Sequence, residues 1–237
     1  MNKQRFIITV LSALVFIAGC STSTDNQKQG DLMLMYQESE NGVEPYASRV
    51  LVTDKFLRLD DGYEQSDFTL YDRSTRTIYT VLREEQSIMK LKPVKTSVKV
   101  EKKLLMDARK LNDKDIPSIE GMFPIHFQLL VNNKLCSDVF AVKGLHKKAV
   151  IALGEFRRTL AEMHLKNLYK TPEELRDDCF IAHDILSPSR TMQFGLPVYQ
   201  FDVNGKKRML VDYNRHYKSK PDLYVLPKNY KTTIMKR

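Results

Sequence analysis

The chain has 237 residues, of which 42% are hydrophobic, so it holds enough apolar material for a sizeable core. Its 38 Lys and Arg residues outnumber its 29 Asp and Glu residues, which gives a formal net charge of +9. We find no internal repeat and no low-complexity segment. The composition therefore excludes repeat and fibrous architectures and indicates a globular protein.

The first twenty residues have the pattern of an export signal. Lys3 and Arg5 supply positive charge, and an apolar run of about 13 residues from Phe6 to Ala18 follows. This run is too short to span a bilayer, because a spanning helix needs about 20 apolar residues. It ends in the small residues Ile17-Ala18-Gly19-Cys20 rather than in a basic flank.

The tetrapeptide Ile17-Ala18-Gly19-Cys20 resembles the lipobox of bacterial lipoproteins. The resemblance implies that residues 1–19 are a lipoprotein signal peptide, and that Cys20 carries a diacylglyceryl group and an acyl chain such as palmitate on its new amino terminus. Two or more acyl chains hold a protein stably on a membrane. The alternatives are an ordinary signal peptide with a chance cysteine and an uncleaved anchor.

The residues after Cys20 predict a location and a tether. In the sorting of bacterial lipoproteins, Asp after the lipidated cysteine favours the inner membrane, and here Ser21 follows instead. The resemblance therefore implies the outer membrane, with the protein facing the periplasm. Residues 20–30 hold no aliphatic or aromatic side chain and predict a flexible tether. Residues 31–237 lack a Pro/Gly/Ser-rich break and predict a single domain.

The basic surplus persists after removal of the leader, which takes away Lys3 and Arg5 but no acid and leaves a formal charge of +7. A basic surface usually indicates nucleic acid, but the export signal argues against that partner. Anionic lipid or lipopolysaccharide is the nearer candidate, and solvated strand faces are the simpler alternative. The surplus forms two groups, Lys95, Lys99, Lys102 and Lys103, and Lys206, Lys207, Arg208, Arg215, Lys218 and Lys220.

The first half of the domain alternates apolar and polar residues in the manner of antiparallel strands with one wet face. Turn signals such as Asn41-Gly42 and Asp60-Asp61-Gly62 separate the strands. Spacings of roughly 8 to 12 residues predict a meander that must curl or be covered. The expected strands are 32–36, 49–52, 56–59, 68–71, 77–82 and 87–91.

The second half adds helices and further strands. Residues 150–168 carry one apolar stripe and predict a helix. Thr171-Pro172-Glu173-Glu174 has the form of a capping box and predicts a second helix to about Leu186, ended by Ser187-Pro188. Further strands are expected at 194–201, 207–213 and 222–227. The expected fold class is α+β, a curved antiparallel sheet or incomplete barrel covered or plugged by about two α-helices.

The hairpins between Tyr46 and Leu91 resemble those of periplasmic proteins related to the lipoprotein carriers LolA and LolB. The closing segment Leu223–Tyr230 is similar to a terminal F-x-[IL]-P-x-G-Y pattern of such proteins, with Asn229 in the place of the glycine. Most of these proteins are uncharacterised lipoproteins. The resemblance covers about half of the domain and this tail, and it implies an incomplete barrel whose concave face can hold acyl chains.

The remaining cysteines predict a disulfide. With Cys20 acylated, Cys136 and Cys179 form an even pair in an oxidising compartment. A bridge between them would pin two distant segments of the domain together. Two buried free thiols are the alternative.

No catalytic pattern is found. The chain lacks a Gly-x-Ser-x-Gly elbow, a Ser-x-x-Lys pair and a phosphate-binding glycine loop. The acids between Glu173 and Asp178 are explained by helix capping. The histidines are scattered without a metal-ligand spacing; they are His126, His146, His164, His183 and His216. We therefore expect no catalytic residue, no metal and no cofactor, and predict that the protein is not an enzyme.

Two functions are consistent with these features. The first is a membrane-anchored, non-catalytic periplasmic lipoprotein that binds lipid, or a lipidated or hydrophobic envelope component, in the concavity of its sheet. The second is a scaffold lipoprotein with a filled core that recruits another envelope protein through its basic face. An enzyme would need a cleft where carboxylates or histidines converge. Inward-facing apolar residues look alike in the first two cases, so the sequence does not choose between them.

Overall fold

The computed structural model describes residues 30–93, 100, 102–113 and 116–235. The predicted leader, the lipidated Cys20 and the predicted tether up to residue 29 lie outside these residues. The described strands all belong to one sheet, in the order β12-β6-β5-β4-β3-β2-β1-β11-β10-β9-β8-β7. Neighbouring strands are antiparallel, except that β12 runs parallel to β6.

The first six strands form the predicted meander. Each of them contains a strand that the sequence predicts. On β1, Leu32, Leu34 and Tyr36 are buried while the residues between them are partly exposed, which is the alternation of a half-buried strand. The strands are β1 (Asp31–Glu40), β2 (Val43–Val52), β3 (Phe56–Asp60), β4 (Phe68–Asp72), β5 (Thr77–Leu82) and β6 (Ser87–Leu91).

Six further strands complete the sheet, and the sequence predicts only two of them. The unpredicted strands are β7 (Met106–Leu111), β8 (Ile125–Val131), β9 (Lys134–Val142) and β12 (Lys231–Ile234). The predicted ones are β10 (Leu196–Asp202) and β11 (Lys207–Tyr217), and β11 pairs with β1 in the middle of the sheet.

The strand expected at 222–227 is wrong. Residues Pro221–Tyr224 form a short 3₁₀ turn, η4. The ring of Tyr224 stacks on Phe56 with 5.5 Å between centroids, and Leu226 packs into the same cluster. These side chains dock on one face of the sheet, so the segment is held by packing rather than by strand pairing.

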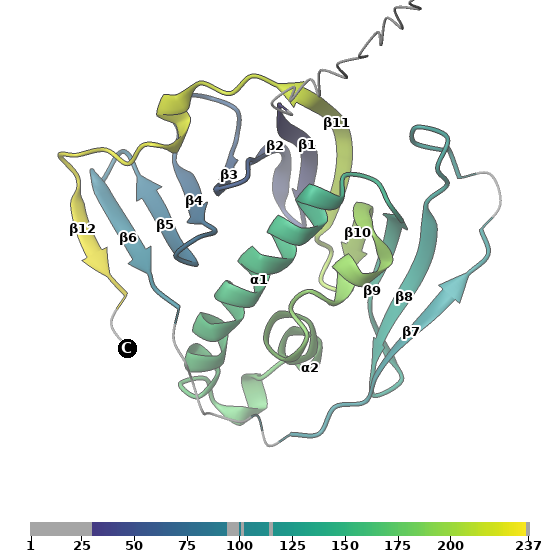
Figure 1. Ribbon diagram of the computed structural model, residues 1–237. Helices are drawn as coiled ribbons and strands as arrows, with labels where there is room; N and C mark the ends of the chain where they lie inside the picture. The colour runs from purple at the N-terminus through teal and green to yellow at the C-terminus, as the bar shows by residue number, and fades with distance from the viewer. Residues whose placement is uncertain (1–29, 94–99, 101, 114–115, 236–237) are drawn as a thin grey trace, which may run out of the picture.

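Helix α1 (Lys147–Leu168) contains the first predicted helix. Figure 1 shows it running across the concave side of the sheet. Its residues Ala149, Ala152 and Leu153 are buried in one cluster with Leu34 and Val50 of the central strands. The apolar stripe of the helix therefore faces the sheet, as an amphipathic surface helix requires.

The second predicted helix is wrong in its length and its start. Residues 171–186 form a 3₁₀ turn η1 (Glu173–Leu175), a short helix α2 (Asp178–Phe180) and a π-helical turn η2 (Ile181–Leu186). The hydroxyl of Thr171 donates to the carbonyl of Asn167, 3.1 Å away, and so does not act as a cap. Asp177 accepts from the backbone N–H of Phe180 instead, at 2.7 Å.

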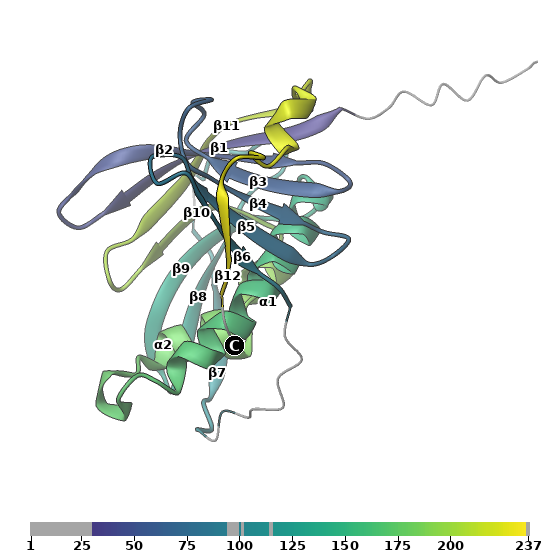
Figure 2. The same cartoon turned by 90° about the vertical axis from the view of Figure 1, so that its left-hand side faces the viewer.

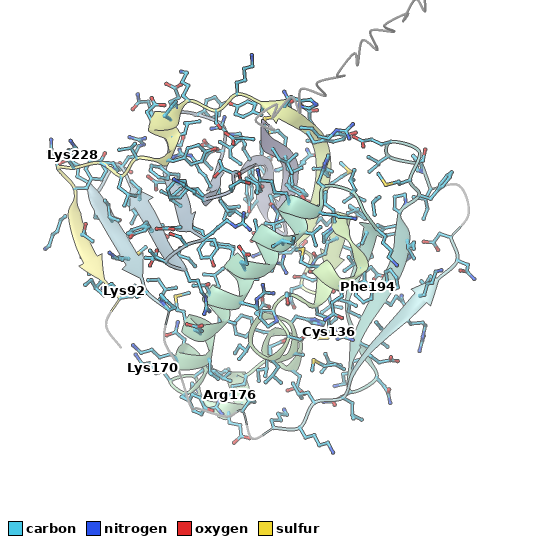
Figure 3. All side chains as sticks on the ribbon, viewed as in Figure 1. Lys92, Cys136, Lys170, Arg176, Phe194 and Lys228 are labelled. Atoms are coloured by element: carbon cyan, nitrogen blue, oxygen red, sulfur yellow. A yellow bond between two sulfur atoms is a disulfide. The ribbon has the colours of Figure 1, made fainter. Side chains whose placement is uncertain are left out.

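The architecture is α+β, a large curved and unclosed sheet with few helices, and this part of the expectation is confirmed (Figure 2). Side chains from α1 and from the strands fill the space between helix and sheet (Figure 3). The middle of the concave face is therefore occupied by the core of the protein. No helix in the described ranges is both long enough and apolar enough to cross a bilayer.

Candidate functional site

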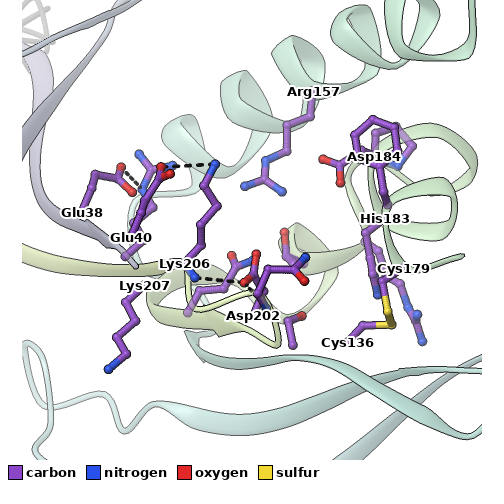
Figure 4. Close-up of a pocket in the computed structure, with 18 of the residues that line it drawn as sticks. Glu38, Glu40, Cys136, Arg157, Cys179, His183, Asp184, Asp202, Lys206 and Lys207 are labelled. Carbon is purple, nitrogen blue, oxygen red and sulfur yellow. Dashed lines mark hydrogen bonds and ion pairs between the residues drawn. A yellow bond between two sulfur atoms is a disulfide. The ribbon is translucent and has the colours of Figure 1, made fainter. Parts of the chain in front are cut away.

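A cleft of about 580 Å³ opens beside α1 (Figure 4). Its walls come from the end of β1, the start of β9, the middle of α1, the α2–η2 segment and the β10–β11 hairpin. The pairing of β1 with β11 and of β10 with β9 brings three of these walls together. The cleft is thus assembled from segments that are far apart in the sequence.

One wall is lined by charges that pair with each other. Arg208 lies 3.1 Å from the carboxylate of Glu38, and Lys206 lies 3.3 Å from that of Glu40. The hydrogen bond with Glu40 raises the pKa of Lys206. Asp202 accepts backbone N–H groups of its own turn, including that of Lys206 at 3.0 Å. Part of the predicted basic group is therefore held in internal ion pairs along this wall.

Arg157 projects from α1 into the cleft. It forms no hydrogen bond or ion pair with any residue that the structure describes. Burial lowers the pKa of its guanidinium, and the nearby charge of Arg208 lowers this pKa further, while Asp184 opposes both effects. Because an arginine stays protonated in proteins, the cleft contains a partly desolvated cation without a close counter-ion.

The cleft is also lined by polar groups without partners. Both ring nitrogens of His183 and the hydroxyl of Thr191 are buried, and neither residue has a hydrogen-bond partner there within the described ranges. Burial, aided by Arg190 and Arg157, lowers the pKa of His183 to about 4, so its ring is neutral at pH 7. Buried polar groups are normally hydrogen-bonded, and these groups therefore offer hydrogen bonds to a ligand or to water.

The predicted disulfide forms part of the cleft wall. Cys136 on β9 and Cys179 on α2 are joined, with their Cα atoms 5.5 Å apart. Phe180 and Pro188 continue the same wall, and Phe180 is 39% exposed. The bridge fixes this partly apolar wall to the sheet. The disulfide that the sequence predicts therefore also shapes the candidate site.

The structure separates most of the other residues that the sequence singled out. His126 lies on β8, with its ring nitrogens 2.5 Å from Asp113 and 2.6 Å from Asp138. His164 and His183, however, both line the cleft, which their spacing in the sequence did not suggest. Within the described ranges, no group of three or more His, Cys, Asp or Glu side chains is placed to hold a metal ion.

Comparisons with known proteins give no family. No protein-family model and no curated protein matches the chain. An uncharacterized conserved protein from Thermus thermophilus is similar over 87% of this chain and 91% of its own, with 11% identity and a TM-score of 0.47. Two crystal forms of PNGF-II are similar over 86% of this chain at 10% identity, with TM-scores of 0.40 and 0.39. The chain spans less than a third of PNGF-II.

Proposed function

We propose that this protein is a membrane-anchored, non-catalytic envelope lipoprotein that binds an amphiphilic ligand, a lipid or a lipidated envelope component, in the cleft beside α1. The observation that carries the proposal is the cleft itself. Its volume of about 580 Å³ lies within the range of small-molecule sites, roughly 300 to 1,000 Å³. Most of its lining side chains are polar or charged, some of them without internal partners among the described residues, and a smaller apolar part comes from Phe180, Pro188 and the disulfide.

The packing of α1 determines where an acyl chain would lie. The space between α1 and the central strands is filled by residues such as Leu34, Val50 and Leu153. In our proposal, α1 and the α2–η2 segment close the concave side of the sheet, and the chain of the ligand lies along Phe180, Pro188 and the disulfide. This differs from a barrel that holds acyl chains under its sheet.

The membrane anchor in this proposal is Cys20, and the disulfide between Cys136 and Cys179 supports an oxidising compartment. Palmitate labelling of the full chain in its own cells tests the anchor. We expect labelled protein in the outer-membrane fraction, and none from a Cys20→Ser variant. Equal labelling of both proteins would contradict the assignment of Cys20.

The hydrogen bonds of the cleft favour binding over catalysis. A nucleophilic site needs a hydroxyl or thiol hydrogen-bonded to its base. Neither ring nitrogen of His183 has such a partner within the described ranges, and the cysteines of the cleft are oxidised. The carboxylates Glu38 and Glu40 are engaged in ion pairs.

Native mass spectrometry of the mature chain, residues 20–237 with Cys20→Ser, tests the binding. Produced by secretion, it should carry a lipid mass. A Phe180→Asp variant should lose that mass, because a carboxylate then lies in the apolar wall. Tyr63→Asp, at a position that is 73% exposed and outside the cleft, is the matched control. Lipid-free wild-type protein in repeated preparations would contradict the proposal.

The filled core under α1 is also what the scaffold alternative expects. A scaffold would recruit an envelope protein through its basic surface. It predicts a crosslinked partner that is lost at high salt, together with an unchanged yield of that partner in Phe180→Asp.

A further inference from the structure

Resting on the proposed function, we propose that the cleft binds the phosphate head group of its ligand on the guanidinium of Arg157, with His183 and Thr191 as further hydrogen-bond donors. The ligand class is then a phosphate-bearing amphiphile. The proposal rests on unpaired donors, on the charge balance of the cleft, and on the apolar wall beside them.

Unpaired donors are the first support. Arg157 has five N–H groups in a planar fork, and none of them is hydrogen-bonded to a residue that the structure describes. A fork of this kind binds two oxygens of a phosphate or carboxylate at once. The neutral ring of His183 and the hydroxyl of Thr191 add one N–H and one O–H in the same cleft. A phosphate monoester offers three strong acceptor oxygens to these donors, against two on a carboxylate.

The charge balance is the second support. Glu38 pairs with Arg208, and Glu40 pairs with Lys206, so these four charges cancel along one wall. The other charged residues of the lining are the cations Arg157, Arg190 and Lys207 and the anions Asp184 and Asp202.

Burial raises the pKa of the Asp184 carboxyl. The buried side chain of Arg190 donates one hydrogen bond, from Nη1 to the carbonyl of Leu130 at 3.4 Å. The lining as a whole therefore carries more positive than negative charge, and a bound anion would balance it in a partly desolvated site.

The apolar wall is the third support. In Figure 4, Arg157 points from α1 into the space between Lys206 on one side and Asp184, His183 and the disulfide on the other. Phe180 and Pro188 line the same cleft, and the ring of Phe180 also contacts His164, with 5.2 Å between centroids. A head group on Arg157 would place the chain of an amphiphile against this wall.

The test compares three probes in titration calorimetry with the mature chain, residues 20–237 with Cys20→Ser. Dodecyl phosphate, below its micelle concentration, carries both head group and chain. Inorganic phosphate carries the head group alone, and dodecanol carries the chain alone. Circular dichroism of each variant verifies that it is folded.

The diagnostic variant is Arg157→Gln, and the matched control is Arg158→Gln. Arg158 is the next residue on the same helix, is exposed and does not line the cleft. We expect dodecyl phosphate to bind at 1:1 stoichiometry, and Arg157→Gln to weaken it at least tenfold, because hydrogen bonds to a charged group are lost. Arg158→Gln should leave its affinity within twofold, and dodecanol should bind wild type and Arg157→Gln equally.

Two outcomes separate this inference from the proposed function. If dodecyl phosphate and dodecanol bind equally well and Arg157→Gln changes neither, the phosphate site is overturned while amphiphile binding stands. If inorganic phosphate binds as tightly as dodecyl phosphate and is lost in Arg157→Gln, the phosphate site stands and its ligand is a free anion, which contradicts amphiphile binding. Absence of binding by all three probes overturns both.

Discussion

Arg73, directly after β4, forms a two-point ion pair with Glu155 in the middle of α1. Its Nε and Nη2 atoms lie 2.7 and 3.2 Å from the two carboxylate oxygens, and its Nη1 donates to the carbonyl of Thr53 at 3.0 Å. The hydrogen bond with Glu155 raises the pKa of Arg73. One side chain thus ties the helix to the turn between β2 and β3 and to the end of β4.

Arg73→Ala should lower the free energy of unfolding by about 1 to 2 kcal/mol, because a two-point, partly buried pair is lost. Urea denaturation measures the change. Arg76→Ala is the control: its pair with Glu162, at 2.8 Å, is more exposed and should cost under about 0.5 kcal/mol. Equal losses in the two variants would show that the Arg73 pair does not hold the helix.

Reduction of the disulfide should also destabilise the domain. The bridge between Cys136 and Cys179 closes a loop across a sequence separation of 43 residues, for which the chain-entropy estimate is about 4 kcal/mol. Urea denaturation with and without reductant measures this loss. The double variant Cys136→Ala/Cys179→Ala should be insensitive to reductant, and a wild type that is equally insensitive would contradict the prediction.

Gly195, between η3 (Arg190–Phe194) and β10, has no room for a side chain. Its φ is +124°, and a Cβ atom there would lie 2.3 Å from the carbonyl oxygen of Val142. Gly195→Ala should cost about 3 kcal/mol or more, since backbone must move. Gly121 also has a positive φ, +74°, but nothing within 4 Å, so Gly121→Ala should cost only about 1 kcal/mol. Thermal melting of both variants tests this order.

His183 should make the domain less stable below neutral pH. Its pKa is about 4 in the folded protein, because burial, Arg190 and Arg157 disfavour the charged ring and Asp177 only partly opposes them, whereas the unfolded chain has a pKa near 6.5. Between these values the unfolded state binds the extra proton, so the free energy of unfolding falls as pH drops from about 6.5 to 4, by roughly 2 to 3 kcal/mol. Urea denaturation at pH 7, 6, 5 and 4 should show a smaller fall in His183→Gln. An identical pH dependence in both proteins would contradict the assignment.

The meander of β1–β6 could be predicted because turn signals such as Asn41-Gly42 separate short apolar strands, and on β1 buried and partly exposed residues alternate. The next three strands lack that pattern. Most of β7 is exposed, so no buried face marks it. On β9 the four residues from Cys136 to Val139 are all buried, but Ser137 and Asp138 among them are polar, so the sequence shows no apolar run there.

The prediction of one continuous second helix is wrong for a different reason. Its capping box was a local signal, and longer-range constraints override it. The disulfide holds Cys179 against β9, and Ile181 and Ile185 pack into a separate cluster with Leu168. These contacts favour short helical turns over one continuous helix.

The candidate site could be predicted only at its cysteines. Cys136 and Cys179 are the two cysteines that remain when Cys20 is acylated, so the sequence predicts their disulfide, and both line the cleft. Arg157 and Thr191 had no sequence signal, because an arginine on a polar helix face usually points to solvent. Arg157 lines a cleft because strand pairing places the β10–β11 hairpin opposite α1. That pairing depends on contacts between residues that are far apart in the sequence, which a local sequence pattern does not reveal.

The register of β1 with β11 has a consequence for the order of assembly. Asp31 pairs with Tyr217, and Ser39 pairs with Lys207, so the central seam joins segments separated by about 170 to 190 residues. The hairpins on either side of this seam are local and can pair as soon as their own residues are available. Late closure of such distant contacts slows folding. The full length of this seam can therefore pair only after residue 217 has left the ribosome.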